Sequence, residues 1–240
     1  MVREVSGFWY ACGMTAFIAK NLAQVRAHIQ AACQTAGRDP ASVRLLAVSK
    51  TWGPEAVRQA HAAGQQAFGE NYIQEGVDKI AALQDLSLQW HCIGPIQSNK
   101  TRGVAEHFDW VHSIDRLKIA QRLSEQRPAH LPALQVCIQV NVDGGSTKSG
   151  VAPAELPALA QAVAALPRLQ LRGLMTIPEP AETPDLMRAV HRQAKALFDA
   201  LNRQGFALDT LSMGMSADLE AAIAEGSTLV RVGTAIFGQR

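Results

Sequence analysis

Val43-Arg44-Leu45-Leu46-Ala47-Val48-Ser49-Lys50 is an almost continuous apolar run that ends at a single lysine. A run of this kind is typical of a parallel strand that is covered on both faces. We therefore predict a buried strand over Val43–Ser49 that delivers Lys50 at its carboxyl end. Because its neighbours are apolar, desolvation would lower the pKa of the lysine amine toward the range in which it attacks a carbonyl carbon.

Seven more strand-like runs follow, separated by helix-like segments. The predicted strands are Val43–Ser49, Gln66–Gly69, Leu88–Ile93, Trp110–Ser113, Leu134–Val140, Leu169–Thr176, Thr210–Met213 and Leu229–Val232. Well-capped helices are predicted over Pro54–Ala63, Asp115–Arg127 and Thr183–Arg203. Eight such alternations in 240 residues match a single-domain α/β fold, the (β/α)8 or TIM barrel. A doubly wound open sheet is the weaker rival, because no Gly-x-Gly-x-x-Gly follows the first strand.

The N-terminus begins with an apolar stretch, Gly7–Met14, ahead of a helix in which Leu22, Val25 and Ile29 recur at helical spacing. The stretch is too short to span a bilayer and lacks the basic cluster of a signal peptide. We interpret residues 1–14 as a dispensable extension, with Met14 as an alternative start, and residues 15–240 as the barrel.

The composition argues against several classes of partner. Lys and Arg number 23 against 21 Asp and Glu, with no run of like charges, so we expect neither nucleic acid nor a membrane to bind. The four cysteines form no Cys-x-x-Cys pair and the seven histidines show no ligand spacing, which predicts a reduced, cytoplasmic protein without a metal site. His61 and His191 are interpreted as helix-surface residues.

Polar residues at the predicted strand ends would meet at one end of a barrel, where barrel enzymes have their active sites. Any one of these residues could equally mark the point where a strand stops. They are Lys50, Asn71, His91, Ser113, Asn141, Thr176, Ser212, Ser216 and Arg231.

Two segments after the seventh and eighth predicted strands have the form of phosphate-binding turns. Ser212-Met213-Gly214-Met215-Ser216 leads into a helix with Ser216 placed as its N-cap, and Arg231-Val232-Gly233-Thr234 follows the next strand. Barrels frequently bind phosphate at these two places. A lysine that can hold an aldehyde, together with a phosphate site, indicates pyridoxal phosphate (PLP).

Arg231 lies within an apolar strand, so its guanidinium must find an acceptor. One interpretation is a structural ion pair across the barrel. The other is a hydrogen bond to the pyridine nitrogen of the cofactor, which would discourage protonation of that nitrogen and make the cofactor a weaker electron sink.

The segment Asp143–Gly150 looks like a nucleotide-binding P-loop, but Thr147 stands where that motif needs glycine. We predict a glycine-rich loop over the mouth of the barrel, with a plain flexible loop as the alternative.

Seven ordered motifs over Ile18 to Gly238 resemble those of the YggS/PROSC family of pyridoxal phosphate homeostasis proteins. They are Ala47-Val48-Ser49-Lys50-Thr51, Phe68-Gly69-Glu70-Asn71-Tyr72, Trp90-His91-Cys92-Ile93-Gly94-Pro95-Ile96-Gln97-Ser98-Asn99-Lys100, Ser146-Thr147-Lys148-Ser149-Gly150, Gly173-Leu174-Met175-Thr176-Ile177 and the two C-terminal segments. Cys92, where an aromatic residue or methionine is expected, and the residues before Met14 depart from the family pattern.

The resemblance implies a barrel like the N-terminal domain of bacterial alanine racemase, with PLP bound covalently as an aldimine on Lys50. It also implies a phosphate site, a partner for the pyridine nitrogen, and a pocket lining. The phosphate site is Ser212, Ser216, Gly233 and Thr234. The partner for the pyridine nitrogen is Arg231, and the pocket is lined by Asn71, His91 and Met175.

Three functions are compatible with this site. A carrier would buffer and deliver PLP to apo-enzymes without catalytic residues of its own. A racemase needs an acid/base on each face of its substrate, whereas Lys50 supplies one, the only tyrosines are Tyr10 and Tyr72, and the chain ends just after the eighth strand, without the further domain of alanine racemases. A Schiff-base aldolase leaves Arg231 unexplained. We expect the carrier, acting as a monomer.

Overall fold

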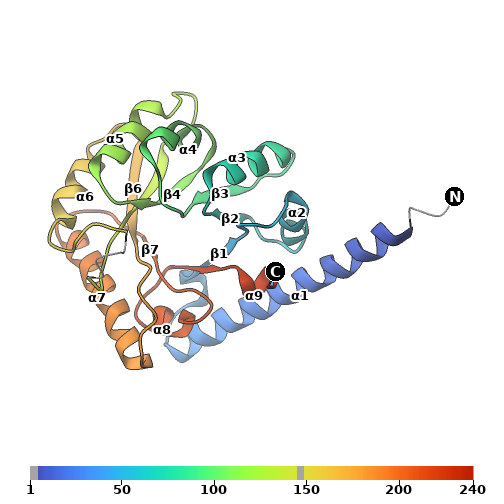
Figure 1. The fold of residues 1–240 in the computed structure, drawn as a ribbon. Helices are drawn as coiled ribbons and strands as arrows, with labels where there is room; N and C mark the ends of the chain where they lie inside the picture. Colours follow the sequence, from blue (N-terminus) through green and yellow to red (C-terminus); the bar gives the residue numbers. More distant parts are fainter. Residues whose placement is uncertain (1–4, 145–148, 240) are drawn as a thin grey trace.

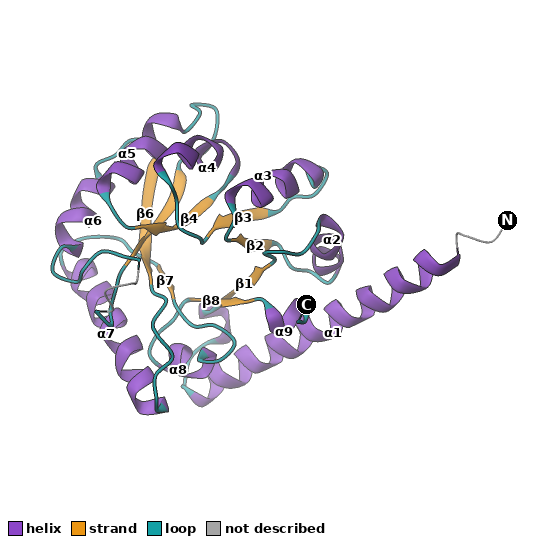
Figure 2. Cartoon of the chain, in the orientation of Figure 1, coloured by secondary structure: helices purple, strands orange, loops and turns teal. Residues whose placement is uncertain are grey.

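The computed structural model describes the backbone of residues 5–144 and 149–239 and, within them, the side chains from residue 16 onward. Eight parallel strands close into a barrel in chain order, and the last strand pairs with the first (Figures 1 and 2). The strands are β1 (Arg44–Val48), β2 (Ala67–Glu70), β3 (Gln89–Cys92), β4 (Trp110–Ile114), β5 (Leu134–Gln139), β6 (Leu169–Met175), β7 (Thr210–Ser212) and β8 (Leu229–Val232). The predicted barrel is confirmed, and each strand boundary lies within one residue of its prediction.

Helices surround the barrel (Figure 2). They are α1 (Val5–Thr35), α2 (Pro54–Ala62), α3 (Ile73–Ala82), α4 (Thr101–His107), α5 (Leu117–Gln126), α6 (Leu156–Ala164), α7 (Pro184–Arg203), α8 (Leu219–Ala224) and α9 (Thr234–Phe237), with short 3-10 turns η1 (Pro40–Ser42) and η2 (Ser98–Lys100). Thr183 is the N-cap of α7, where its hydroxyl accepts from Leu186 N. Helix α5 begins two residues later than predicted, because Arg116 has extended backbone angles.

Helix α1 packs one apolar face, which includes Ile18, Leu22, Val25 and Ile29, against the barrel and its neighbouring helices. These residues recur every three or four positions, so they lie on one side of the helix. The helix runs through Met14 without a break, and its first turns project beyond the barrel (Figure 1).

Helix α7 corrects the interpretation of His191 as a surface residue. His191 is fully buried, and its Nε2 lies 3.0 Å from Asp218 Oδ2. It belongs to the apolar stripe of α7 together with Ala194, Phe198 and Leu201, so the helix buries it with that stripe. His61, on α2, is half-exposed.

Strands β6 and β7 approach each other closely at Gly173. Its register partner is Thr210, and a Cβ on Gly173 would lie only 1.6 Å from Thr210 O. No side chain can be added there unless the strands move apart, so glycine is required at this position.

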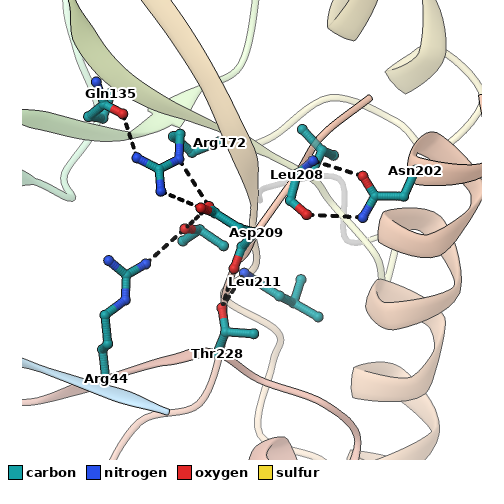
Figure 3. Close-up of polar contacts among 9 residues, drawn as sticks. Arg44, Gln135, Arg172, Asn202, Leu208, Asp209, Leu211 and Thr228 are labelled. Atoms are coloured by element: carbon teal, nitrogen blue, oxygen red, sulfur yellow. Dashed lines mark hydrogen bonds and ion pairs between the residues drawn. The ribbon is translucent and has the colours of Figure 1, made fainter. Parts of the chain in front are cut away.

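A polar cluster lies at the amino end of the barrel, where the strands begin (Figure 3). Arg172 donates to Gln135 Oε1 and Asp209, while Arg44 donates to Thr210 Oγ1 across 2.8 Å. Both guanidinium groups lie over the Trp110 ring, 5.4 Å (Arg44) and 5.0 Å (Arg172) from its centroid. This cluster lies at the end of the barrel opposite the predicted site.

Within residues 5–144 and 149–239, every helix is either too short or too polar to cross a membrane.

Candidate functional site

Arg231 is the centre of the polar groups at the carboxyl end of the barrel. Its side chain is buried, with Nη1 donating to Ser212 O (2.8 Å) and Ser212 Oγ (2.7 Å) and Nη2 donating to Thr176 O (2.8 Å). Burial lowers the pKa of the guanidinium to about 10, so it stays protonated at neutral pH. Within the described part of the chain, the hydrogen-bond acceptors of Arg231 are neutral oxygens. The structural ion pair considered from the sequence is therefore not the interaction that the guanidinium makes.

A line of hydrogen-bonded side chains runs from Ser212 through two buried histidines to Gln89, which is exposed at the start of β3. Ser212 Oγ lies 2.9 Å from His112 Nδ1, His112 Nε2 lies 2.9 Å from His91 Nδ1, and His91 Nε2 lies 3.0 Å from Gln89 Oε1. Burial lowers the pKa of both histidines, that of His91 to about 3, so both rings are neutral.

Neutral rings allow one direction for this line. Gln89 Oε1 can only accept, so His91 Nε2 donates to it; neutral His91 then accepts at Nδ1 from His112 Nε2, and His112 Nδ1 accepts from Ser212 Oγ. His91 also stacks on Trp110, with ring centroids 5.3 Å apart. Both ring nitrogens of His91 are therefore occupied within the barrel, and His91 acts on the site through Ser212.

Lys50 lies two residues after β1, at the carboxyl end of the barrel. Its side chain is exposed, which corrects the expectation that apolar neighbours desolvate it; the apolar run that precedes it faces the core, while Lys50 has passed the end of the strand. The pairing of Ala47 with Val232 sets Lys50 beside the turn that follows β8. Gly233 in that turn packs on β1, since a Cβ there would lie 3.0 Å from Val48 O.

Ser216 is exposed and does not cap a helix, so that prediction is wrong. Helix α8 begins at Leu219 with Asp218 at the N-cap position, and the Asp218 carboxylate accepts from Met215 N across 2.6 Å, which closes the turn around Ser216. Ser216 lines a groove of about 1080 Å³ between α1, α7 and α8, and no other predicted site residue lines that groove.

The other predicted residues occupy different depths. Met175 is fully buried in a cluster with Trp110 and Cys137, and is therefore part of the barrel interior. Asn71 is half-buried after β2, and Thr234 is the exposed first residue of α9. Thr176 is buried, and its Oγ1 has no hydrogen-bond partner among the described residues.

The predicted mouth loop is described only at its two ends, because Gly145 and the motif residues Ser146, Thr147 and Lys148 lie outside the described residues. Asn141 Oδ1 accepts from Gly144 N (3.0 Å), and Asp143 Oδ2 accepts from Glu179 N (2.7 Å). The residues before the loop are thus tied to the chain that follows β6.

Sequence reasoning missed His112, Gln89, Glu70 and Lys79. His112 alternates with Trp110 and Ile114 along β4, and that two-residue period could have placed it on the same side of the strand as Trp110. Lys79 could not be recognised from the sequence, because a lysine on a helix is usually exposed, whereas this one is buried.

Comparison with known proteins supports one family. Residues 20–240 match the model of the alanine racemase N-terminal domain. The pyridoxal phosphate homeostasis protein of Pseudomonas aeruginosa is 64% identical over 223 residues, which cover 93% of this chain and 96% of the relative. That of Escherichia coli strain K12 is 58% identical over 226 residues, covering 93% and 97%.

Solved structures agree with the sequence comparison. PipY of Synechococcus elongatus PCC7942 with PLP bound is 41% identical, with a TM-score of 0.81, over 92% of this chain and 100% of PipY. Alanine racemase of Corynebacterium glutamicum shares the fold alone, with 19% identity and a TM-score of 0.68 over 94% of this chain and 61% of the racemase. Because it is similar to these relatives over nearly their full length, this chain belongs to the family of pyridoxal phosphate homeostasis proteins.

Proposed function

We propose that this protein binds pyridoxal phosphate covalently through Lys50 and buffers and delivers it inside the cell, without robust catalysis of its own. The observation that carries the proposal is the arrangement at the carboxyl end of the barrel. There Lys50 follows β1, in which Val48 packs against Gly233, and the buried, protonated Arg231 lies on the adjacent strand β8. The names of the close relatives and the PLP-bound state of PipY support the same ligand.

The chemistry of the residues fits this cofactor. PLP offers an aldehyde, a ring nitrogen and a phosphate dianion, and it acts as an electron sink when bound to enzymes. Lys50 Nζ would condense with the aldehyde, forming a carbon–nitrogen double bond with release of water. Thr176 Oγ1, buried without a described partner, is costly to leave unpaired, and a polar ligand would relieve that cost.

The phosphate contacts are assigned to Ser216, Gly233 and Thr234. The hydroxyl-bearing members, Ser216 and Thr234, are both exposed and follow strands β7 and β8. Ser212, the fourth residue that the family pattern implies, already bonds Arg231 and His112, so we assign it to orienting Arg231.

The pocket lining divides in the same way. Asn71, half-buried after β2, is assigned to contact with the cofactor. His91 and Met175 are buried in the barrel interior, and we assign them to supporting the pocket without contacting the cofactor.

The carrier is favoured over a racemase because a second base has no clear source among the described residues. Tyr72 is 59% exposed and precedes α3, which argues against a fixed, partly desolvated acid/base. A protonated Arg231 next to the ring nitrogen would also keep that nitrogen unprotonated and weaken stabilisation of a carbanion.

The first experiment tests covalent binding. Purified protein incubated with PLP should develop a visible chromophore, and borohydride reduction should fix the cofactor to the peptide that contains Lys50. Lys50→Ala should abolish both signals, whereas Lys118→Ala, a change at an exposed lysine of α5, should not. A protein that stays colourless with PLP, or one in which another lysine is labelled, would contradict the proposal.

The second experiment separates carrier from racemase. The PLP-loaded protein should restore activity to an apo-enzyme and elute as a monomer, while a panel of amino acids in deuterium oxide should show no robust α-proton exchange. Rapid exchange with one amino acid would instead support the racemase.

A further inference from the structure

Lys50 lies in a turn whose backbone conformation is unfavourable for its sequence. Ser49 O accepts from Trp52 N across 3.1 Å, so Ser49–Trp52 is a β-turn with Lys50 and Thr51 at its centre. Thr51 has a φ of 67°, whereas Lys50 does not have a positive φ. That combination belongs to the type II turn, which normally has glycine or asparagine at the third position. A β-branched threonine is strained there.

Three side chains form hydrogen bonds with this turn. Glu75 Oε1 accepts from Thr51 N (2.5 Å), Lys79 Nζ donates to Ser49 O (2.7 Å), and Glu70 Oε1 accepts from Ser49 Oγ (2.6 Å). The residues on both sides of Lys50 are therefore fixed by groups from α3 and from the end of β2.

The three side chains are also bonded to one another. Lys79 Nζ lies 2.7 Å from Glu70 Oε1 and 2.7 Å from Glu75 Oε1, which with Ser49 O uses all three of its N–H donors. The Lys79 and Glu70 side chains are 4% and 0% exposed, so water screens their pair little, whereas Glu75 is 27% exposed. Its ammonium is fully bonded and buried, unlike the exposed Lys50.

We propose that Lys79, together with Glu70 and Glu75, is a positioning group that holds the Ser49–Trp52 turn in the conformation that directs Lys50 to the cofactor. The inference rests on the proposed role of Lys50. Lys79 would act through the backbone of Ser49 and, by way of Glu75, through that of Thr51, without touching the cofactor.

Lys79→Met tests the proposal in the full-length protein. It keeps an unbranched apolar side chain but removes the donors to Ser49 O and the two carboxylates. We expect about tenfold weaker PLP binding, by absorbance titration, and a changed rate of Lys50 acylation by an amine-directed reagent without PLP, read by peptide mass spectrometry. Lys195→Met, which removes a half-exposed pair with Asp199 on α7, should leave both measurements unchanged.

The Thr51→Gly change supplies a rescue that a merely structural role would not predict. Glycine adopts a positive φ without strain, so Lys79→Met combined with Thr51→Gly should return PLP affinity and Lys50 labelling to within about twofold of the parent protein. Should Lys79→Met fail to fold, Glu75→Ala removes the acceptor for Thr51 N and is tested in the same way.

The outcomes are distinct. Parental affinity and Lys50 labelling in folded Lys79→Met or Glu75→Ala, or a loss that Thr51→Gly does not reverse, would overturn the positioning role. A parent protein that traps no PLP on Lys50 would instead overturn the proposed function, and acylation of the apo-protein would still report on the turn.

Discussion

Arg231 Nη1 donates to Ser212 Oγ across 2.7 Å, and the same serine oxygen lies 2.9 Å from His112 Nδ1 on β4. Gln89 Oε1 accepts from His91 Nε2, so neutral His91 accepts from His112 Nε2 and His112 Nδ1 accepts the serine hydrogen, which leaves the serine lone pairs to accept from Arg231. The orientation of Arg231 thus depends on residues that do not contact a ligand at the carboxyl end of the barrel.

Removing His112 should therefore disturb both stability and cofactor binding. His112→Phe keeps a ring of similar size but removes the acceptor for the Ser212 hydroxyl and the donor to His91 Nδ1. We expect a loss of about 2 kcal/mol in the free energy of unfolding by urea titration, and a shifted absorbance spectrum of bound PLP. His107→Phe, at the exposed end of α4, is the control; equal effects of the two changes would contradict the role of the line.

The buried histidines also predict how stability depends on pH. Burial, with a smaller contribution from Arg44, lowers the pKa of His91 to about 3, below the value of about 6.5 in the unfolded chain. Between these values the unfolded state binds the additional proton, so stability falls as pH falls. From pH 7.5 to pH 5 His91 should account for a loss of about 2 kcal/mol.

The measurement is urea unfolding of the parent and of His91→Phe at both pH values, with the smaller loss expected in the variant. Burial raises the pKa of Glu70, which acts in the opposite direction, but that contribution is common to both proteins and cancels in the difference. Identical pH dependence would show that His91 is not the titrating group.

Gly173→Ala should strongly destabilise the barrel. The new methyl group would overlap Thr210 O, and relief requires β6 and β7 to separate where they are hydrogen-bonded. We expect a loss of about 3 kcal/mol or more by thermal or urea unfolding. Gly103→Ala, on α4, is the matched control; the nearest contact of its new Cβ would be 3.8 Å, so the helix should gain up to about 1 kcal/mol.

The barrel could be predicted from the sequence because its strands are continuous apolar runs, a local pattern that is recognisable without knowledge of distant contacts. The sequence was also sufficient to bring Arg231, Ser212 and Thr176 together, since parallel strands deliver their ends to one edge. The sequence could not predict how deeply each side chain is buried. Lys50 was expected to be buried but is exposed, because that depends on where β1 ends relative to its neighbours rather than on local hydrophobicity.

The same limit explains the errors at Ser216 and His191. A serine after a glycine turn suits an N-cap, yet Asp218 provides the side chain that closes this turn, and His191 is buried against it. Both outcomes depend on a contact between α7 and the segment before α8, which no local pattern reports.

The cluster at the amino end of the barrel should contribute to stability without affecting the cofactor site. Asp209 faces Arg172 and accepts from Thr210 Oγ1 (2.8 Å). Although partial burial raises the pKa of Asp209, the hydrogen bonds from Arg172 and Thr210 bring it below its ordinary value. Its contribution to stability is therefore present above pH 4 or so and is lost as pH falls through the folded-state pKa.

Asp209→Asn should cost about 1 kcal/mol at pH 7, a modest value because this carboxylate is half-exposed and solvent screens it. The difference from the parent protein should shrink toward zero in urea titrations near pH 3, where both side chains are neutral, and PLP affinity should not change at pH 7. Asp199→Asn, at the Lys195 pair on α7, is the surface control, with an expected cost below about 0.5 kcal/mol. A loss of PLP affinity in Asp209→Asn would show that the two ends of the barrel are coupled, which the separate hydrogen-bond networks of Arg172 and Arg231 argue against.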